Sequence, residues 1–226
     1  MAFKRVYFIR HGESELNIGR IRQGPEGNLS ERGRAQARAT GLRFRTIPVN
    51  AIIASPYPRA QETAEIIAKE IGKEVITSEL FIERRNPSEI VGKWADDVEV
   101  RKIVDFIDKS FHQDNVRYSD EENFVDLRDR AKKALDFLEQ RPEKNILVVT
   151  HSIFMVMLAA YLVSREKLTA EEFVTRGAFN PIGNTGITFA TYDVHKSGSE
   201  AHGWNLISWN DEPYVQYPMP VLEEDN

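Results

Sequence analysis

Short apolar runs alternate along the chain with longer stretches in which apolar residues recur every three or four positions. The short runs are rich in Val and Ile, and such continuous apolar runs are typical of strands buried on both faces of a sheet. They lie at Val6–Ile9, Ala51–Ser55, Glu74–Thr77 and Ile146–Thr150. The longer stretches predict helices over 30–45, 58–72, 122–140 and 153–163. This alternation predicts an α/β fold, in which helices cover both faces of a mostly parallel central sheet.

Two of these predicted helices carry additional signals. The 58–72 stretch has Pro58 in its first turn and Gly72 at its end, and these residues favour a helix start and a helix stop. The 153–163 stretch is apolar on all sides, which predicts a helix buried in the core rather than one with a face in water. It is also too short to span a bilayer, so the sequence predicts no association with a membrane.

Residues 79–120 interrupt the alternation. The stretch is polar, contains Pro87 and Trp94, and predicts one helix around Val98–Phe111. We expect it to form a lid-like insertion at about 79–120, over one end of the sheet. The insertion would belong to a single three-layer domain that spans residues 1–226.

The last part of the chain returns to strand patterns. Residues 186–194 and 203–211 alternate apolar and polar positions, which predicts an antiparallel pair of strands at the edge of the sheet. The end of the chain contains Pro213, Pro218 and Pro220 and is expected to be extended.

Composition narrows the classes of protein that this pattern allows. The chain has 30 Lys and Arg against 35 Asp and Glu, a formal net charge of −5, and no long block of one sign. Binding to nucleic acid is therefore not expected. There is no cysteine, which excludes disulfides and thiolate chemistry. The N-terminus lacks the long apolar segment of a signal peptide, so a cytoplasmic location is the default expectation.

Polar residues follow three of the predicted strands at the point where each strand ends. The first strand ends in Arg10-His11-Gly12, the second leads to Arg59 at a helix start, and the fourth ends in His151. In open α/β sheets, ligand sites form beyond the carboxyl ends of the strands. We therefore expect two histidines and two arginines to converge on one site.

This set of side chains suits a phosphate ligand. Arginines offer forked donors that match phosphate oxygens, and the start of the helix after His151 would add backbone N–H groups. One imidazole can attack phosphorus to form a covalent intermediate, while the other helps to neutralise charge on the transferred group. A metal ion is the rival use of two histidines, but the neighbouring arginines would repel a cation, so we predict no metal site.

Four segments carry a resemblance to a known family. "IRHGESELN", "SPYPRAQETA", "IERRNPSE" and "VVTHS" occur in this order and together resemble the histidine phosphatase superfamily, in its phosphoglycerate-mutase-like branch. Arg-His-Gly alone would be a weak signal, but the four segments in order are specific. The resemblance extends from Val6 to about Asp211.

The resemblance implies roles for particular residues. His11 would be the nucleophile that becomes phosphohistidine, and Glu83 would be the proton donor that enters from the lid. The phosphate would be bound by a group of side chains around His11: Arg10, Asn17, Arg59 and His151. Gln23 and Gly24 lie in the loop that contacts substrate in relatives. No cofactor is implied.

Three functions are compatible with this resemblance. We favour a metal-independent phosphomonoesterase that acts on a small phosphorylated molecule through a phosphohistidine intermediate. The alternative is a cofactor-dependent phosphoglycerate mutase, but Gly24-Pro25 stands where such mutases carry Gly-Trp, and "ERRNPSEIVG" is closer to phosphatase-like members. The third is a non-catalytic phospho-ligand binding module, which would usually have lost one of the pocket residues. The sequence leaves the physiological substrate open, and also the oligomeric state, with a homodimer as one candidate.

Overall fold

Strand β1 (Phe3–Arg10) lies inside a six-stranded sheet whose order is β3-β2-β4-β1-β5-β6. The computed structural model describes residues 3–114, 116–179, 182–193, 195 and 203–212. Strands β2 (Ala51–Ala54), β3 (Val75–Thr77) and β4 (Asn145–Thr150) continue the sheet in parallel on one side of β1. Strands β5 (Ile187–Asp193) and β6 (Trp204–Asp211) are antiparallel and complete the other side. The mostly parallel sheet with an antiparallel edge pair is thus confirmed.

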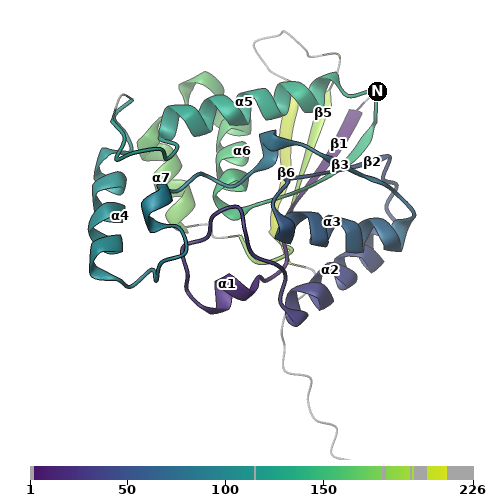
Figure 1. Ribbon diagram of the computed structural model, residues 1–226. Helices are drawn as coiled ribbons and strands as arrows, with labels where there is room; N and C mark the ends of the chain where they lie inside the picture. The colour runs from purple at the N-terminus through teal and green to yellow at the C-terminus, as the bar shows by residue number, and fades with distance from the viewer. Residues whose placement is uncertain (1–2, 115, 180–181, 194, 196–202, 213–226) are drawn as a thin grey trace, which may run out of the picture.

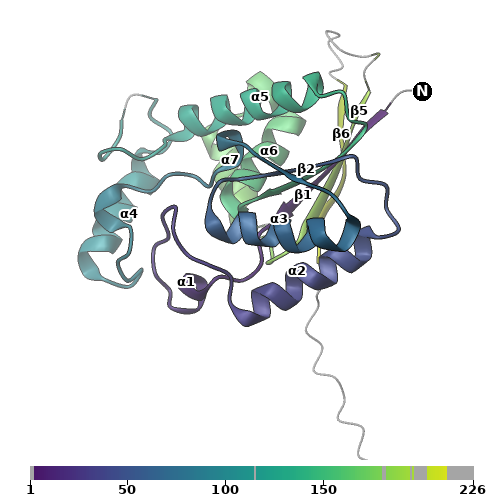
Figure 2. The same cartoon turned by 45° about the vertical axis from the view of Figure 1, so that its right-hand side comes forward.

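Helices cover both faces of this sheet. Helices α2 (Glu31–Phe44) and α3 (Pro58–Ile71) lie side by side on one face, and α5 (Phe124–Gln140), α6 (Ser152–Ser164) and α7 (Ala170–Phe179) lie on the other (Figures 1 and 2). Residues of the central strands pack into two hydrophobic cores, one on each face of the sheet. Val6 and Phe8 pack with the core beneath α5 and α6, whereas Ile9 packs with the core beneath α2 and α3. The predicted three-layer arrangement is therefore confirmed.

The helix boundaries follow the predicted signals. Pro58 is the first residue of α3, and the helix ends at Gly72, whose φ of 64° is in the left-handed region that glycine favours. Ser30 caps α2 by accepting a hydrogen bond from the backbone N–H of Gly33. Helix α6 is buried along almost its whole length, as its uniformly apolar sequence predicts. No helix in the described part of the chain is both long and apolar enough to cross a membrane.

Some elements escaped prediction. Helix α1 (Glu15–Ile18) is only one turn long and is held by a capping box between Ser14 and Asn17, so it has no apolar period to detect. Helix α7 was also not predicted. Three short 3₁₀ helices, Glu79–Phe81, Ser88–Ile90 and Arg165–Lys167, occur in connections. The proline-containing end of the chain, predicted to be extended, lies outside the described residues.

The insertion forms a separate layer at the end of the molecule where α1 lies. Its helix α4 (Val98–Ser110) stands away from the sheet in both views (Figures 1 and 2). A short antiparallel ladder joins the insertion to the loop after β1. The backbone N–H of Arg22 donates to Lys93 (2.9 Å), that of Gly92 donates to Arg22 (2.9 Å) and that of Ala95 donates to Arg20 (3.0 Å). This ladder brings the lid against the loop that follows the first polar motif.

Candidate active site

The ends of β1, β2 and β4 bring the predicted polar residues together. The imidazole rings of His11 and His151 lie with their centroids 5.1 Å apart, and the His11 backbone N–H donates to the Thr150 carbonyl (2.9 Å). A central cavity of about 400 Å³ opens at this point. Six of the predicted site residues line it: Arg10, His11, Asn17, Gln23, Arg59 and Glu83.

His11 is held in one tautomer by its neighbour. Its side chain is buried, and its Nδ1 lies 2.6 Å from the carbonyl oxygen of Gly12. Because a carbonyl can only accept, Nδ1 carries the hydrogen and Nε2 keeps the lone pair in the neutral ring. Burial, reinforced by the charges of Arg10 and Arg59, lowers the pKa of His11 well below its ordinary value. The side chain is therefore a neutral imidazole with a nucleophilic Nε2.

Gly12 is required by a close approach of two backbone segments. A Cβ on Gly12 would lie 2.6 Å from the carbonyl oxygen of Gly33, in the first turn of α2. The Gly12 N–H also donates to the hydroxyl of Thr63 on α3 (3.1 Å). The strand exit is thus packed tightly against the start of α2 and tied to α3, and this fixes the peptide that orients His11.

The two arginines have buried, unpartnered donors at the same place. The side chain of Arg59 is 2% exposed, and its Nη1 donates to the carbonyls of Gly24 (3.0 Å) and Glu26 (2.9 Å). Arg10 donates through Nη1 to Ile182 (2.5 Å). The Nε atoms of both arginines are buried and have no hydrogen-bond partner among the described residues. A buried donor without a partner costs about 1–3 kcal/mol, so an anion with several acceptor oxygens would stabilise this arrangement.

His151 is the N-cap residue of α6 and is fully buried. Its Nε2 lies 2.8 Å from Oγ of Ser55, while its Nδ1 has no partner in the part of the chain that is described. Burial lowers the pKa of His151 well below its ordinary value, and the nearby His11, Arg59 and Arg10 add to this effect. The ring therefore stays neutral, with one nitrogen held by Ser55 and the other unpartnered.

Glu83 reaches the site from the beginning of the insertion. Its Oε1 accepts hydrogen bonds from the backbone N–H groups of Arg84 (2.8 Å) and Phe154 (3.0 Å), and its Oε2 accepts from Ile153 (3.2 Å). The carboxylate thus sits at the N-terminus of α6, where the helix dipole favours a negative charge. Two carboxylate oxygens offer about four acceptor positions, so one position remains beyond these three donors.

Asn17 and Gln23 belong to the segment that follows β1. Asn17 lies on helix α1 rather than in a loop, and its Oδ1 accepts hydrogen bonds from the backbone (3.2 Å) and hydroxyl (2.9 Å) of Ser14. Its amide NH₂ is then the group left for a ligand. The backbone carbonyl of Gln23 accepts a hydrogen bond from Asn86 of the lid (3.2 Å).

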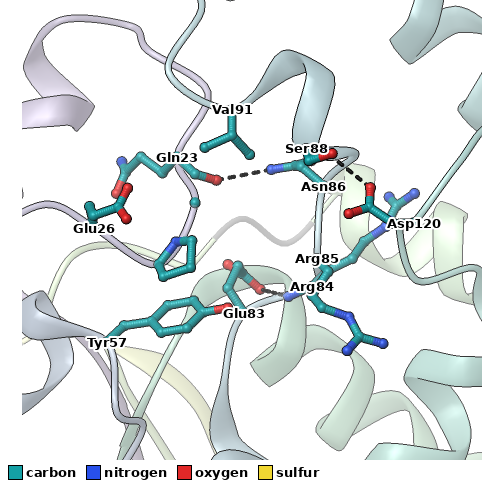
Figure 3. Close-up of a pocket in the computed structure, with 12 residues that line it drawn as sticks. Gln23, Glu26, Tyr57, Glu83, Arg84, Arg85, Asn86, Ser88, Val91 and Asp120 are labelled. Atoms are coloured by element: carbon teal, nitrogen blue, oxygen red, sulfur yellow. Dashed lines mark hydrogen bonds between the residues drawn. The ribbon is translucent and has the colours of Figure 1, made fainter.

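A second cavity, of about 360 Å³, adjoins the central one. The two share Gln23, Glu83, Arg84 and Asn86, and the second extends over Tyr57. Figure 3 shows Glu83 near its middle, between Tyr57 and Arg84. Gly24 lines this cavity and not the central one. A Cβ on Gly24 would lie 2.6 Å from Cγ1 of Val91, so the loop and the lid approach too closely there for a side chain.

Sequence reasoning missed several residues of the site. Ser55 was assigned only to a strand, although it stands at the same kind of strand exit as His11 and His151. Arg20 and Arg22 also line the central cavity. No alternation in the sequence could have placed them, because Arg20 has a φ of 52°, in the left-handed region, and Ile21 lines the cavity as well. Among the described residues, no group of three or more histidine, aspartate or glutamate side chains is arranged to hold a metal ion.

Comparison with known proteins identifies the family. Residues 6–211 match the model of the histidine phosphatase superfamily (branch 1), and the chain belongs to this family. A curated relative, the probable phosphoglycerate mutase GpmB of Photorhabdus laumondii, is 32% identical over 97% of this chain and 98% of its own length. The resemblance predicted from the four sequence segments is thereby confirmed.

Solved structures share the fold over nearly the whole chain. A phosphoserine phosphatase from Entamoeba histolytica is 25% identical, with a TM-score of 0.73, over 92% of this chain and 98% of that one. A mycobacterial glucosyl-3-phosphoglycerate phosphatase has the same TM-score at 22% identity, over 92% of this chain and 99% of that one. Both likenesses agree with the fold described above.

Proposed function

We propose that this protein is a metal-independent phosphomonoesterase that acts on a small phosphorylated molecule through a phosphohistidine at His11. The observation that carries the proposal is the state of His11. Its Nδ1 is fixed on the Gly12 carbonyl, its Nε2 makes no hydrogen bond to a described residue, and the unpartnered donors of Arg10 and Arg59 are buried beside it. A neutral nucleophile surrounded by phosphate-binding donors suits attack on phosphorus.

In the first step, Nε2 of His11 attacks the phosphorus and the bond to the leaving alkoxide breaks. The guanidinium groups of Arg10 and Arg59, the amide of Asn17 and Nδ1–H of His151 donate to the oxygens of the transferred group. Glu83, protonated at this stage, gives its proton to the leaving oxygen. The products are the alcohol and phosphohistidine, and Glu83 is left as a carboxylate.

In the second step, water attacks the phosphorus from the side that the alcohol has left. Glu83 accepts a proton from this water, the bond between phosphorus and Nε2 breaks, and inorganic phosphate leaves. This restores the neutral imidazole and the protonated Glu83. The arginines and the helix N-terminus supply the positive charge that a metal ion would otherwise bring, so the reaction needs no added metal.

Phosphoglycerate mutase activity is the second candidate, and the name of the relative at 32% identity favours it. In a mutase, the substrate itself and not water takes the phosphoryl group from His11. The structure supports the phosphatase in one respect, because Pro25 lines the adjoining cavity where mutases of the family carry a tryptophan. With 3-phosphoglycerate and a bisphosphoglycerate primer, we expect slow release of phosphate. Rapid conversion to the 2-phospho isomer with little free phosphate would favour the mutase over the phosphatase.

The decisive experiment follows an aryl phosphate in the presence of EDTA. We expect turnover under these conditions, and a rapidly quenched reaction should contain phosphate bound to His11 in a linkage that is labile to acid and stable to alkali. His11→Ala should abolish both the adduct and turnover. Absence of turnover with any phosphomonoester would favour the third candidate, a non-catalytic phospho-ligand binding module. Activity lost in EDTA and restored by magnesium would contradict metal independence.

Location and assembly belong to the same proposal. We propose a cytoplasmic protein, in keeping with a chain that has no cysteine. A homodimer also stays a prediction. Light scattering coupled to size exclusion, at concentrations spanning the assay range, distinguishes a monomer from a dimer.

A further inference from the structure

The central cavity is lined by three arginines that the proposed chemistry does not use, Arg20, Arg22 and Arg84. We propose that the physiological substrate carries a second anionic group, such as a carboxylate, and that Arg22 binds it. This inference rests on the proposed function, because it describes the part of the substrate beyond the transferred phosphate. It makes Arg22 a residue that determines specificity rather than one that takes part in phosphoryl transfer.

The backbone around Arg22 is fixed by the lid. Arg22 both donates to Lys93 (2.9 Å) and accepts from Gly92 (2.9 Å), and Ile21 pairs with Trp94 in an isolated antiparallel bridge. Arg22 is therefore presented from a rigid ladder, and it lines the central cavity together with His11.

The side chain of Arg22 differs from the other cavity arginines in its partners. Arg20 forms an ion pair with Asp96 (3.0 Å), and Arg84 donates to the carbonyl of Glu122 (3.3 Å) and lies over the ring of Phe111. The Nε of Arg22 is buried and has no hydrogen-bond partner in the described part of the chain. No ion pair of Arg22 occurs there either. Its donors are thus left for a ligand.

The charges along the cavity point to the same ligand. Five arginines line it (Arg10, Arg20, Arg22, Arg59 and Arg84), and Glu83 is the one carboxylate among the lining residues that are described. Arg10 and Arg59 face the proposed phosphate site, and Arg20 shares the carboxylate of Asp96 with Arg101. Glu83 already accepts three backbone hydrogen bonds. The charge of Arg22 is then unbalanced, although the whole chain has a net charge of −5. A second anion on the substrate would balance it.

The experiment uses ligands that bind without reacting. The dissociation constants of phosphonocarboxylic acids of increasing chain length are measured by calorimetry, each beside its neutral carboxamide. We expect the best-fitting acid to bind about ten- to a hundred-fold more tightly than its amide, as for a hydrogen-bonded charged pair. In Arg22→Gln this preference should disappear, while the amide keeps its affinity within about three-fold. Arg22→Lys should keep part of the preference, because it keeps the charge but not the forked donors.

Several results would overturn the inference. One is equal binding of each phosphonocarboxylic acid and its carboxamide by the wild-type protein. This result can be observed without any variant. Another is an equal loss for acid and amide in Arg22→Gln together with weaker binding of inorganic phosphate, which would place Arg22 on the transferred group. Arg101→Gln is the matched control, because Arg101 pairs with Asp96 on the lid surface and does not line the cavity. Because these ligands are not hydrolysed, a failure of the proposed function, seen as absent turnover, is a separate result.

Discussion

The strand exits and the lid differ in how deeply their side chains are buried. At the strand exits, His11, His151 and Arg59 are buried, and backbone carbonyls or a neighbouring hydroxyl hold each of them. The lid is far more open to solvent. Its exposed residues include several large apolar side chains: Trp94, Val98, Phe106 and Tyr118. The residues proposed to carry out the chemistry are thus buried at the sheet, whereas the lid proposed to contact the rest of the substrate leaves large apolar side chains in solvent.

The contrast teaches where catalytic and substrate-selecting residues are placed. A phosphoryl group is the same in every substrate, so the residues that hold it can be fixed by the core. The remainder of the substrate varies, and in our proposal it meets Glu83, Arg84 and Arg22, which lie on the lid or on the loop paired with it. Glu83 belongs to both regions, because a lid residue completes its contacts on the N-terminus of the core helix α6.

The largest effect is expected from replacing Glu83, the residue that belongs to both regions. Glu83→Gln keeps the shape of the side chain but cannot deliver a proton, so hydrolysis of an alkyl phosphate should slow by about a hundred- to ten-thousand-fold. An aryl phosphate with a good leaving group should lose far less. The measurement is kcat for both substrates in each protein. Glu89→Gln is the control, because this lid carboxylate is exposed and accepts from the Ser119 hydroxyl (2.8 Å) instead of lining the site. An equal loss on both substrates would assign the proton to another group.

The next largest effect tests how the lid is anchored. Arg130 on α5 forms a buried ion pair with Glu122 (2.7 Å) and donates to the backbone carbonyls of Ile82 (2.8 Å) and Glu83 (3.3 Å). Arg130→Met leaves the Glu122 charge buried and unpaired, so the free energy of unfolding should fall by about 3–5 kcal/mol in urea titrations. Alkyl phosphate hydrolysis should also slow, because the peptide that carries Glu83 loses its anchor.

A matched ion pair on the surface provides the control for this anchor. Arg117 pairs with Asp126 at the same distance of 2.7 Å, but both side chains are about one-third exposed. Arg117→Met should therefore cost less than about 1 kcal/mol. Similar losses in the two variants would show that the buried pair does not hold the lid, and that the contrast between the regions is smaller than the contacts suggest.

The sequence predicted the strand exits much better than the lid, for a physical reason. Parallel strands alternate with helices, and their carboxyl ends meet at one edge, so Arg10, His11, Arg59 and His151 could be brought together without coordinates. The lid has no such rule. Trp94 is 61% exposed, and Arg101 pairs with Asp96 on the surface, and neither placement follows from a pattern in the sequence.

Contacts between segments remote in sequence were also beyond prediction. The ladder that presents Arg22 depends on hydrogen bonds to residues of the lid that carry no pattern of their own. Ser55 ends a predicted strand, but a serine at a strand end is common, and only the fold shows that its hydroxyl meets the His151 ring. Local periodicity predicts which elements form, and it says little about which side chains meet across them.

A smaller effect is expected when His151 loses its hydrogen-bond partner, the hydroxyl of Ser55. If the Ser55 hydroxyl donates to Nε2 of His151, the hydrogen stays on Nδ1, which can then donate to a phosphoryl oxygen. Ser55→Ala frees the other tautomer, and kcat should fall by about ten- to a hundred-fold, the size of one lost hydrogen bond to a charged group. Ser55→Thr should restore most of the rate, and inhibition by inorganic phosphate should weaken only in the alanine variant.

Loss of a buried hydroxyl elsewhere separates this role from simple destabilisation. Thr40 is fully buried and its hydroxyl donates to the Gln36 carbonyl (3.0 Å) within α2. Thr40→Val should lower the stability of the protein without changing kcat. If Ser55→Ala behaves in the same way, Ser55 supports only the fold.

The smallest effect is expected in how the free energy of unfolding depends on pH. Burial lowers the pKa of His11 and of His151 in the folded protein, so both are neutral there while the unfolded chain takes up protons below about pH 6.5. Stability is therefore greatest above that pH and falls as the pH drops through it, by up to about 1.4 kcal/mol per pH unit for each histidine.

His151→Gln removes one of these groups, so the slope of unfolding free energy against pH should become shallower between about pH 6.5 and 5.5, a range above the titration of most carboxylates. Urea titrations at closely spaced pH values measure the slope in the wild-type protein and in the variant. An unchanged slope in His151→Gln would mean that the ring is protonated or solvated in the folded state, and the strand exits would then be no more closed to solvent than the lid.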